Sequence, residues 1–177
     1  VYLASQINNT SGGVIDKIAF KQASSATLTR QWDVYLTNYG TNILNTTGNE
    51  SVQIASEDKV YSGDVTTNSG WVVIDVNDFT YTGENLLVTV LDKSDGLAND
   101  VYFYVDNSYD SEIYGFSYYT LNAVDPTAGT NYCNSYGFKN LIQITFAAAG
   151  SEPEPTGPTV TVTATDTEVH TGETVTL

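Results

Sequence analysis

Two acidic segments in the second half of the sequence carry the residues best suited to bind a cation. They are LDKSDGLAND (91–100) and VDNSYDSE (105–112). Ca²⁺ takes about six to eight hard oxygen ligands, and clustered carboxylates repel one another unless a cation lies between them. Turns also favour Asp and Asn without any metal, so solvated turn acids are the alternative to a structural calcium site. The candidate calcium ligands are Asp92, Asp95, Asn99, Asp100, Asp106 and Asp110.

Tyrosine and asparagine concentrate in the same half of the chain, in YDSEIYGFSYY (109–119) and NYCNSYGF (131–138). Sugars stack their C–H faces on aromatic rings and exchange hydrogen bonds with amides and carboxylates. The alternative is that these rings fill a tyrosine-rich β-sheet, because Tyr is common in strands. A ligand site is expected on the loops 93–100, 107–112 and 120–137, above a rigid scaffold. Its candidate residues are Tyr109, Tyr114, Tyr118, Tyr119, Asn122, Tyr132 and Asn134.

The sequence contains few residues or motifs that are typical of an active site. It lacks the Gly-x-Ser-x-Gly, His-Glu-x-x-His and Walker patterns. His170 is the only histidine and lies far along the chain from Cys133, the only cysteine, so a Cys–His pair and an intrachain disulfide are both unexpected. Carboxylate pairs such as Asp106 and Asp110 arise by chance in a chain with 21 acidic residues. We therefore expect a protein that is not an enzyme.

The charge balance excludes two classes of partner. The chain has 21 acidic and 6 basic residues and a formal net charge of -15. Such a field repels phosphate backbones and anionic lipid surfaces, so we expect no nucleic-acid binding and no membrane docking. No apolar run reaches the ~18 residues of a membrane span. The chain begins at Val1 rather than Met and stops within GETVTL, so we expect a piece of a longer, secreted or cell-surface protein.

β-Strands are the expected secondary structure. Thr, Val and Tyr are abundant, and no long stretch has a helical period. Short strands at this spacing, separated by turn residues, predict an all-β antiparallel β-sandwich or jelly roll. The expected strands are 13–20, 28–40, 51–56, 59–65, 71–76, 85–92, 99–106, 112–119 and 140–146.

One stretch, TNSGWVVIDVNDFTYTGENLLVTV (67–90), predicts a β-hairpin. Two β-rich runs flank a turn that contains Gly83, a residue suited to tight reversal. We expect this hairpin to be scaffold, without a binding role of its own. The side chains expected to anchor it in the core are Trp71, Val73, Phe79 and Tyr81.

The composition changes near residue 150 and divides the chain into three parts. Residues 1–149 form the expected β-sandwich. Residues 150–158 contain three of the four prolines and predict a stiff, extended linker. Residues 159–177 alternate Val with Thr and resemble the first strands of a bacterial immunoglobulin-like or PKD-type module. We expect this tail to start a neighbouring domain or to pair with another sheet, in particular through 159–164, which allows self-assembly.

Several segments of the first part carry a family resemblance. The segments are VYLASQI (1–7), GVIDKIAFKQ (13–22), TRQWDVYLTN (29–38), KVYSGDV (59–65), GWVVIDVNDFTYTGENLLVTVLD (70–92) and NLIQITF (140–146). In this order they resemble the β-sandwich modules of Bacteroidetes surface proteins, which are related to cleaved-adhesin or haemagglutinin domains with a galactose-binding-like jelly-roll fold.

The resemblance implies a non-catalytic adhesion module that recognises carbohydrate or host protein, and calcium stabilises many such modules. It carries over no ligand residue, because the matched motifs are structural. The alternative is a structural repeat or spacer of a surface fibre, or an accessory domain of a secreted protease or glycosidase.

Overall fold

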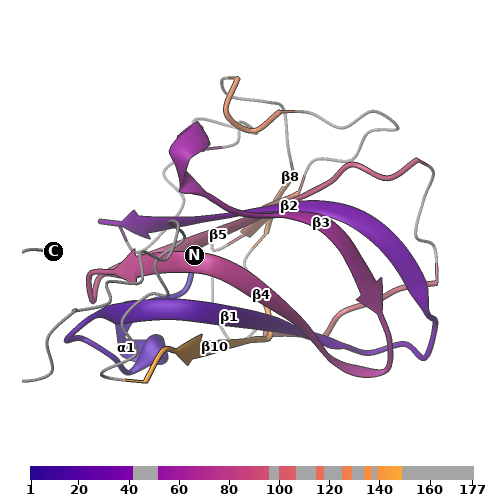
Figure 1. The fold of residues 1–177 in the computed structure, drawn as a ribbon, viewed down its shortest axis with the longest axis horizontal. Helices are drawn as coiled ribbons and strands as arrows, with labels where there is room; N and C mark the ends of the chain where they lie inside the picture. The colour runs from indigo at the N-terminus through magenta and orange to yellow at the C-terminus, as the bar shows by residue number, and fades with distance from the viewer. Residues whose placement is uncertain are drawn as a thin grey trace, which may run out of the picture.

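The chain folds into an antiparallel β-sandwich, which confirms the predicted class. The computed structural model describes residues 1–41, 52–95, 100–106, 115–117, 125–128, 134–136 and 139–148. Two three-stranded sheets, in the orders β10-β1-β4 and β3-β2-β5, lie in two layers (Figure 1). The first contains β1 (Gly13–Gln22), β4 (Gly70–Tyr81) and β10 (Ile142–Phe146). The second contains β2 (Leu28–Tyr39), β3 (Lys59–Thr67) and β5 (Asn85–Asp92).

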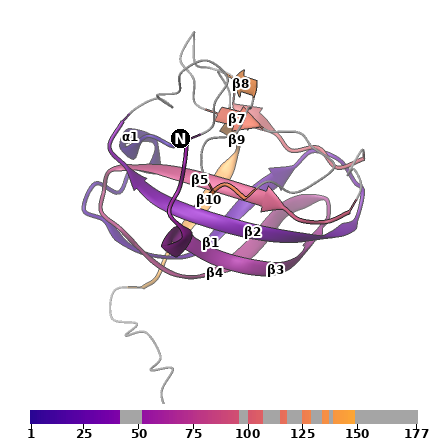
Figure 2. The ribbon, with the colours of Figure 1, turned by 90° about the horizontal axis from the view of Figure 1, so that it is seen from above.

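Small elements complete the described structure. They are a one-turn helix α1 (Ala4–Ile7), the 3₁₀ turn η1 (Ser56–Asp58) and four short strands. In Figure 2, β7 and β8 lie together beyond one side of the sandwich. In the described part of the chain, no helix is long and apolar enough to cross a membrane. The short strands pair as β6 (Val105–Asp106) with β9 (Lys139–Asn140), and β7 (Gly115–Ser117) with β8 (Asn134–Tyr136).

The main core lies between the two sheets and follows the alternation of the strands. On β2, Trp32, Val34 and Leu36 are buried in this core, as a period of two requires. A β-bulge in β1 between Ile15 and Lys17 breaks the alternation there. The extra residue lets Ile15 and Ile18, three positions apart, both enter the core with no exposed surface. The bulge explains why both faces of this strand look apolar in the sequence.

A second, smaller core covers the outer side of sheet β3-β2-β5. It contains Tyr35, Leu87 and Ile54, of which Ile54 is only 4 % exposed. The predicted strand at 51–56 is wrong where the structure describes it. Residues 52–55 have no regular structure and lead into η1. The large apolar residues of this segment pack against the outer side of the sheet and do not belong to a paired strand.

The predicted hairpin at 71–92 is also wrong, because its two strands belong to different sheets. β4 pairs with β1, whereas β5 pairs with β2. The connection at 82–84 therefore crosses from one layer to the other. Gly83 makes the crossing with φ 89°, and a Cβ there would lie 2.3 Å from the backbone oxygen of Thr10. Only glycine fits such a position without strain.

Two of the four predicted core anchors of this stretch point to solvent. Tyr81 is 1 % exposed and Phe79 is half-buried against the main core, as predicted. Trp71 and Val73 are 39 % and 57 % exposed, so their predicted inward orientation is wrong. The physical reason is parity: Val72, Ile74 and Val76 take the inward positions of β4, which leaves the alternate positions outside.

Candidate functional site

The outer face of sheet β10-β1-β4 gathers exposed aromatic and aliphatic side chains. Its first row is set by the register of β4 against β1, which places Trp71 opposite Lys21. In the next row Val73 lies opposite Ala19. We call this surface the Trp71 face and define it by Trp71, Val73, Lys21, Tyr102, Tyr104 and Leu141.

The segment 102–104 extends the Trp71 face on the side of β1 away from β4. Phe103 forms a β-bridge with Gln22 and points inward, where its ring lies 6.3 Å from that of Phe20 and 6.1 Å from that of Trp32. Its neighbours Tyr102 and Tyr104 must therefore point outward. The Tyr104 backbone N–H donates to the Lys21 carbonyl over 2.8 Å. Lys21 is thus flanked by Trp71 on one side and Tyr104 on the other.

The rings of the Trp71 face are accessible to a ligand. Tyr102 and Tyr104 are 63 % and 49 % exposed, and Leu141 is 40 % exposed. The Lys21 ammonium nitrogen lies 5.3 Å from the centroid of the Trp71 ring, a cation–π contact. An exposed contact of this kind is worth about 0.5–1 kcal/mol. It therefore orients the indole but is weak enough for a ligand to displace the ammonium group from the ring.

Polar side chains border the apolar part of the face. Lys17 lies opposite Asp75, and its ammonium nitrogen is 2.5 Å from a carboxylate oxygen. This hydrogen bond raises the pKa of Lys17, and both side chains remain largely exposed. On β10, Gln143 and Thr145 are exposed in register with Ala19 and Lys17. The face therefore offers charged, amide and hydroxyl groups beside its rings.

The tyrosine-rich site predicted from the sequence falls almost entirely outside the described residues. Asn134 begins β8, whose backbone pairs with Ser117 of β7. The role of this site in ligand binding stays a prediction. Its other members, Tyr109, Tyr114, Tyr118, Tyr119, Asn122 and Tyr132, lie outside the described ranges.

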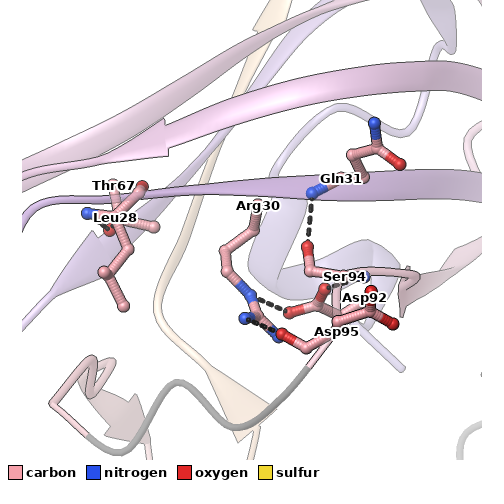
Figure 3. A network of polar contacts seen from close by, with 7 residues as sticks. All are labelled: Leu28, Arg30, Gln31, Thr67, Asp92, Ser94 and Asp95. Carbon is pink, nitrogen blue, oxygen red and sulfur yellow. Dashed lines mark hydrogen bonds and ion pairs between the residues drawn. The ribbon is translucent and has the colours of Figure 1, made fainter. Parts of the chain in front are cut away.

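The first predicted calcium segment is tied to the sheet by Arg30. Figure 3 shows the guanidinium reaching the Asp92 carboxylate, with Nε 2.8 Å from Oδ2, and the Asp95 carbonyl, at 3.4 Å from Nη1. Asp92 also accepts the Ser94 backbone N–H over 2.9 Å, and Ser94 Oγ accepts the Gln31 N–H over 2.6 Å. Burial raises the pKa of Asp92, but the hydrogen bonds from Arg30 and Ser94 outweigh it and lower the pKa overall. An arginine therefore neutralises this carboxylate.

The remaining predicted calcium ligands are not brought together in the described structure. Asp100 is exposed in a turn, and Asp106 lines a cavity beside Lys139. Asn99 and Asp110 lie outside the described ranges. Among the residues that the structure describes, no group of three His, Cys, Asp or Glu side chains is placed to hold a metal ion. A structural calcium ion stays a prediction.

A buried charge cluster on β2 was not anticipated from the sequence. The Asp33 side chain is 4 % exposed and lies 2.8 Å from Lys59 Nζ and 2.6 Å from Lys93 Nζ. Ser62 Oγ donates to it over 2.6 Å. Burial raises the pKa of Asp33, but the hydrogen bonds from Lys59, Lys93 and Ser62 bring it down to about 2. Two of the six basic residues of the chain are used here to connect β2 with β3 and with the residue that follows β5.

The alternation of β2 contained a signal for this cluster, because Asp33 shares its parity with Tyr35, whose ring is buried in the second core. That β3 and the end of β5 supply the partners of Asp33 could be identified only from the register.

Comparisons of the chain with protein-family models, with curated proteins and with solved structures find no match. What the Trp71 face can bind therefore follows from its own chemistry.

Proposed function

We propose that this chain is a non-catalytic, secreted or cell-surface module that binds a neutral polysaccharide on the Trp71 face. The observation that carries the proposal is the exposure of Trp71, Tyr104 and Tyr102 on one sheet face, where burial would be the norm for such rings. The resemblance to adhesin-type modules supports the same class of function.

Stacking on the rings supplies the main interaction. The C–H faces of a sugar are apolar and pack on an indole or phenol ring, while the hydroxyl groups turn to polar neighbours. Trp71 and Tyr104 lie on opposite sides of Lys21, about two strand spacings or roughly 10 Å apart. A single sugar ring cannot cover both side chains. An extended chain of sugars can.

The charge of the protein selects among polysaccharides. With a net charge of -15, the molecule repels sulfated, sialylated and uronate-rich chains. Of the two lysines on this face, Lys17 is already paired with Asp75. A neutral glycan meets no such repulsion and finds donors and acceptors in Lys21, Gln143 and Thr145.

Affinity electrophoresis of the full chain tests the proposal. Native gels contain soluble glucan, xylan, mannan or galactan, with polygalacturonate and heparan sulfate as anionic comparisons. We expect at least one neutral polysaccharide, and neither anionic one, to retard the protein. The substitution Trp71→Ala should abolish the retardation.

The matched control is Leu28→Ala, which removes an apolar side chain of similar exposure (37 %) from the other sheet. It should bind like the wild type, and circular dichroism should show both variants folded. Retardation by the anionic chains, or equal retardation of wild type and Trp71→Ala, would refute the proposal.

A further inference from the structure

Among the residues that the structure describes, strand β10 lies at the edge of its sheet. It pairs only with β1 in the described structure and ends the sheet order β10-β1-β4. Leu141 accepts a hydrogen bond from Lys21, and the Ala147 N–H donates to Val14, so the odd-numbered residues direct their backbone groups to β1. The backbone groups of Ile142, Ile144 and Phe146 then point to the other edge. In the described residues no strand pairs with them.

A cavity of about 250 Å³ lies along the same strand. Its apolar lining includes Ile142, Ile144 and Phe146 of β10 and Ile7 of α1, and its polar lining includes Gln6, Asp106 and Lys139. These four apolar residues are only partly buried although they pack against the main core. The described part of the molecule thus places backbone groups that have no partner strand there directly beside space for apolar side chains. An extended strand needs both features to add to a sheet.

We propose that β10 accepts residues 159–164 of a second copy of this chain as an added strand. This segment, TVTVTA, alternates Val160, Val162 and Ala164 with threonines. Pairing along β10 places these small apolar side chains over the cavity and the threonines in solvent. The segment carries no charge, so its approach adds no repulsion to a strongly acidic surface.

The linker favours a second copy over the chain's own tail. Ten residues separate Ala148 from Thr159, which is long enough for a return loop, but three of them, Pro153, Pro155 and Pro158, favour an extended linker that leads the segment away from its own β10. A contact between the tail of one copy and the edge of the next is heterologous. It therefore builds rings or open filaments, and two copies that exchange their tails form the smallest closed assembly.

Sedimentation velocity of the full chain tests this proposal. We expect the wild type to associate into dimers or larger species as its concentration rises. Val162→Pro removes a strand N–H in the tail without touching the sandwich, and it should leave a monomer. Val175→Pro places the same substitution elsewhere in the tail and should associate like the wild type.

A mixing experiment provides a second test of the proposal. Ile144→Pro removes an N–H that points away from β1. The substitution therefore blocks the outer edge of β10 without removing a hydrogen bond to β1. It should be monomeric alone but form a heterodimer, and nothing larger, with Val162→Pro. If Ile144→Pro does not fold, the tail variants alone decide the question.

A wild type that stays monomeric at every concentration overturns the proposal, and so does association of Val162→Pro at wild-type strength. Amide hydrogen exchange identifies one alternative. Protection of Ile142, Ile144 and Phe146 in a monomer, lost in Val162→Pro, would show that the chain's own tail covers the edge, and it too would overturn the second-copy assignment.

Discussion

Trp71 and Lys21 face each other across strands β4 and β1, with the ammonium nitrogen 5.3 Å from the indole centroid. The cation–π contact favours one orientation of the partly exposed indole ring. It also leaves a donor beside the ring, where a sugar hydroxyl would lie. The pair thus combines an apolar surface with a polar contact.

The contributions of the two side chains should be separable. Trp71→Ala removes the stacking surface and should weaken polysaccharide binding at least tenfold, or about 1.4 kcal/mol. Lys21→Met keeps the aliphatic stem and removes the donor, and about fivefold weaker binding is expected for one hydrogen bond of about 1 kcal/mol. Isothermal titration with the polysaccharide found by electrophoresis measures both. A larger loss for Lys21→Met than for Trp71→Ala would contradict the proposed stacking.

Tyr104 should determine how binding depends on the length of the sugar chain. Short oligosaccharides cover Trp71 alone, whereas longer ones also reach Tyr104 on the other side of Lys21. Tyr104→Ala should therefore leave the affinity for short oligosaccharides unchanged and remove the extra affinity for longer ones. Titrations with oligomers of increasing length give the answer. An equal loss of affinity at every length would contradict a role for Tyr104 as a second contact reached only by longer oligosaccharides.

The Asp33 cluster should make stability depend on pH in the acid range. The folded-state pKa of Asp33, about 2, lies below its ordinary value of 3.8, so folding favours the ionised form. The resulting stabilisation of about 2 kcal/mol is complete well above pH 3.8 and is lost as the pH falls through 3.8 towards 2. Asp33→Asn should lower the free energy of unfolding by about this amount at neutral pH, and the two proteins should converge near pH 2.

Urea titrations over a series of pH values measure this difference. Asp75→Asn is the control, since the Asp75 side chain is 78 % exposed in its pair with Lys17. It should change stability by less than about 0.5 kcal/mol. A pH-independent difference between wild type and Asp33→Asn would exclude the depressed pKa as its cause.

Gly83 should be sensitive to the smallest possible substitution. Gly83→Ala adds a methyl group 2.3 Å from the Thr10 oxygen and places it at φ 89°, so we expect a loss of about 2 kcal/mol or more. Gly40→Ala meets no atom within 4 Å and should change stability by less than about 0.5 kcal/mol. Thermal unfolding of both variants makes the comparison. Equal stability of the two would show that the crossing between sheets relaxes around the new methyl group.

Asp92 should stabilise the end of β5 through Arg30, independently of a metal ion. Asp92→Asn weakens the bond to the guanidinium and should cost about 1 kcal/mol or less, because the carboxylate is 35 % exposed. Asp95→Asn should have no effect, since Arg30 contacts only its backbone carbonyl. The loss for Asp92→Asn should be the same in calcium and in EDTA. A wild-type melting temperature that falls in EDTA, with no such fall in Asp92→Asn, would instead identify Asp92 as a calcium ligand.

Strand positions followed well from residue types, whereas pairing did not. The predicted runs at 13–20, 28–40, 59–65 and 85–92 match β1, β2, β3 and β5 within a few residues, because β-branched and aromatic residues mark pleated, half-buried backbone. The partner of each strand depends on contacts distant in sequence. A three-residue connection such as 82–84 suits a hairpin as well as a crossing between layers.

The outward orientation of Trp71 could have been predicted from the alternation of side chains along β4, although its size suggested a core position. Trp71 and Val73 look like core residues, yet Asp75 and Asn77 share their parity and are exposed. The opposite parity, Val72, Ile74 and Val76, is entirely apolar and forms the core. A count over the whole strand would have placed Trp71 outside. Tyr104 could not be placed in this way, because its position depends on a bridge to Gln22 formed by Phe103.

The order of the strands has a consequence for how the protein forms. The chain changes layer between β1 and β2, between β3 and β4, and again between β4 and β5, and β1 acquires its second neighbour only from β10. Strands that are distant in sequence pair slowly, because the conformational entropy of the intervening chain is lost before the contacts between the strands are gained. During synthesis, Ile15 must wait for Phe146 to leave the ribosome before its sheet is complete. The apolar side chains of β1 therefore stay partly uncovered until β10 has been synthesised, and uncovered strands of this kind are prone to aggregation.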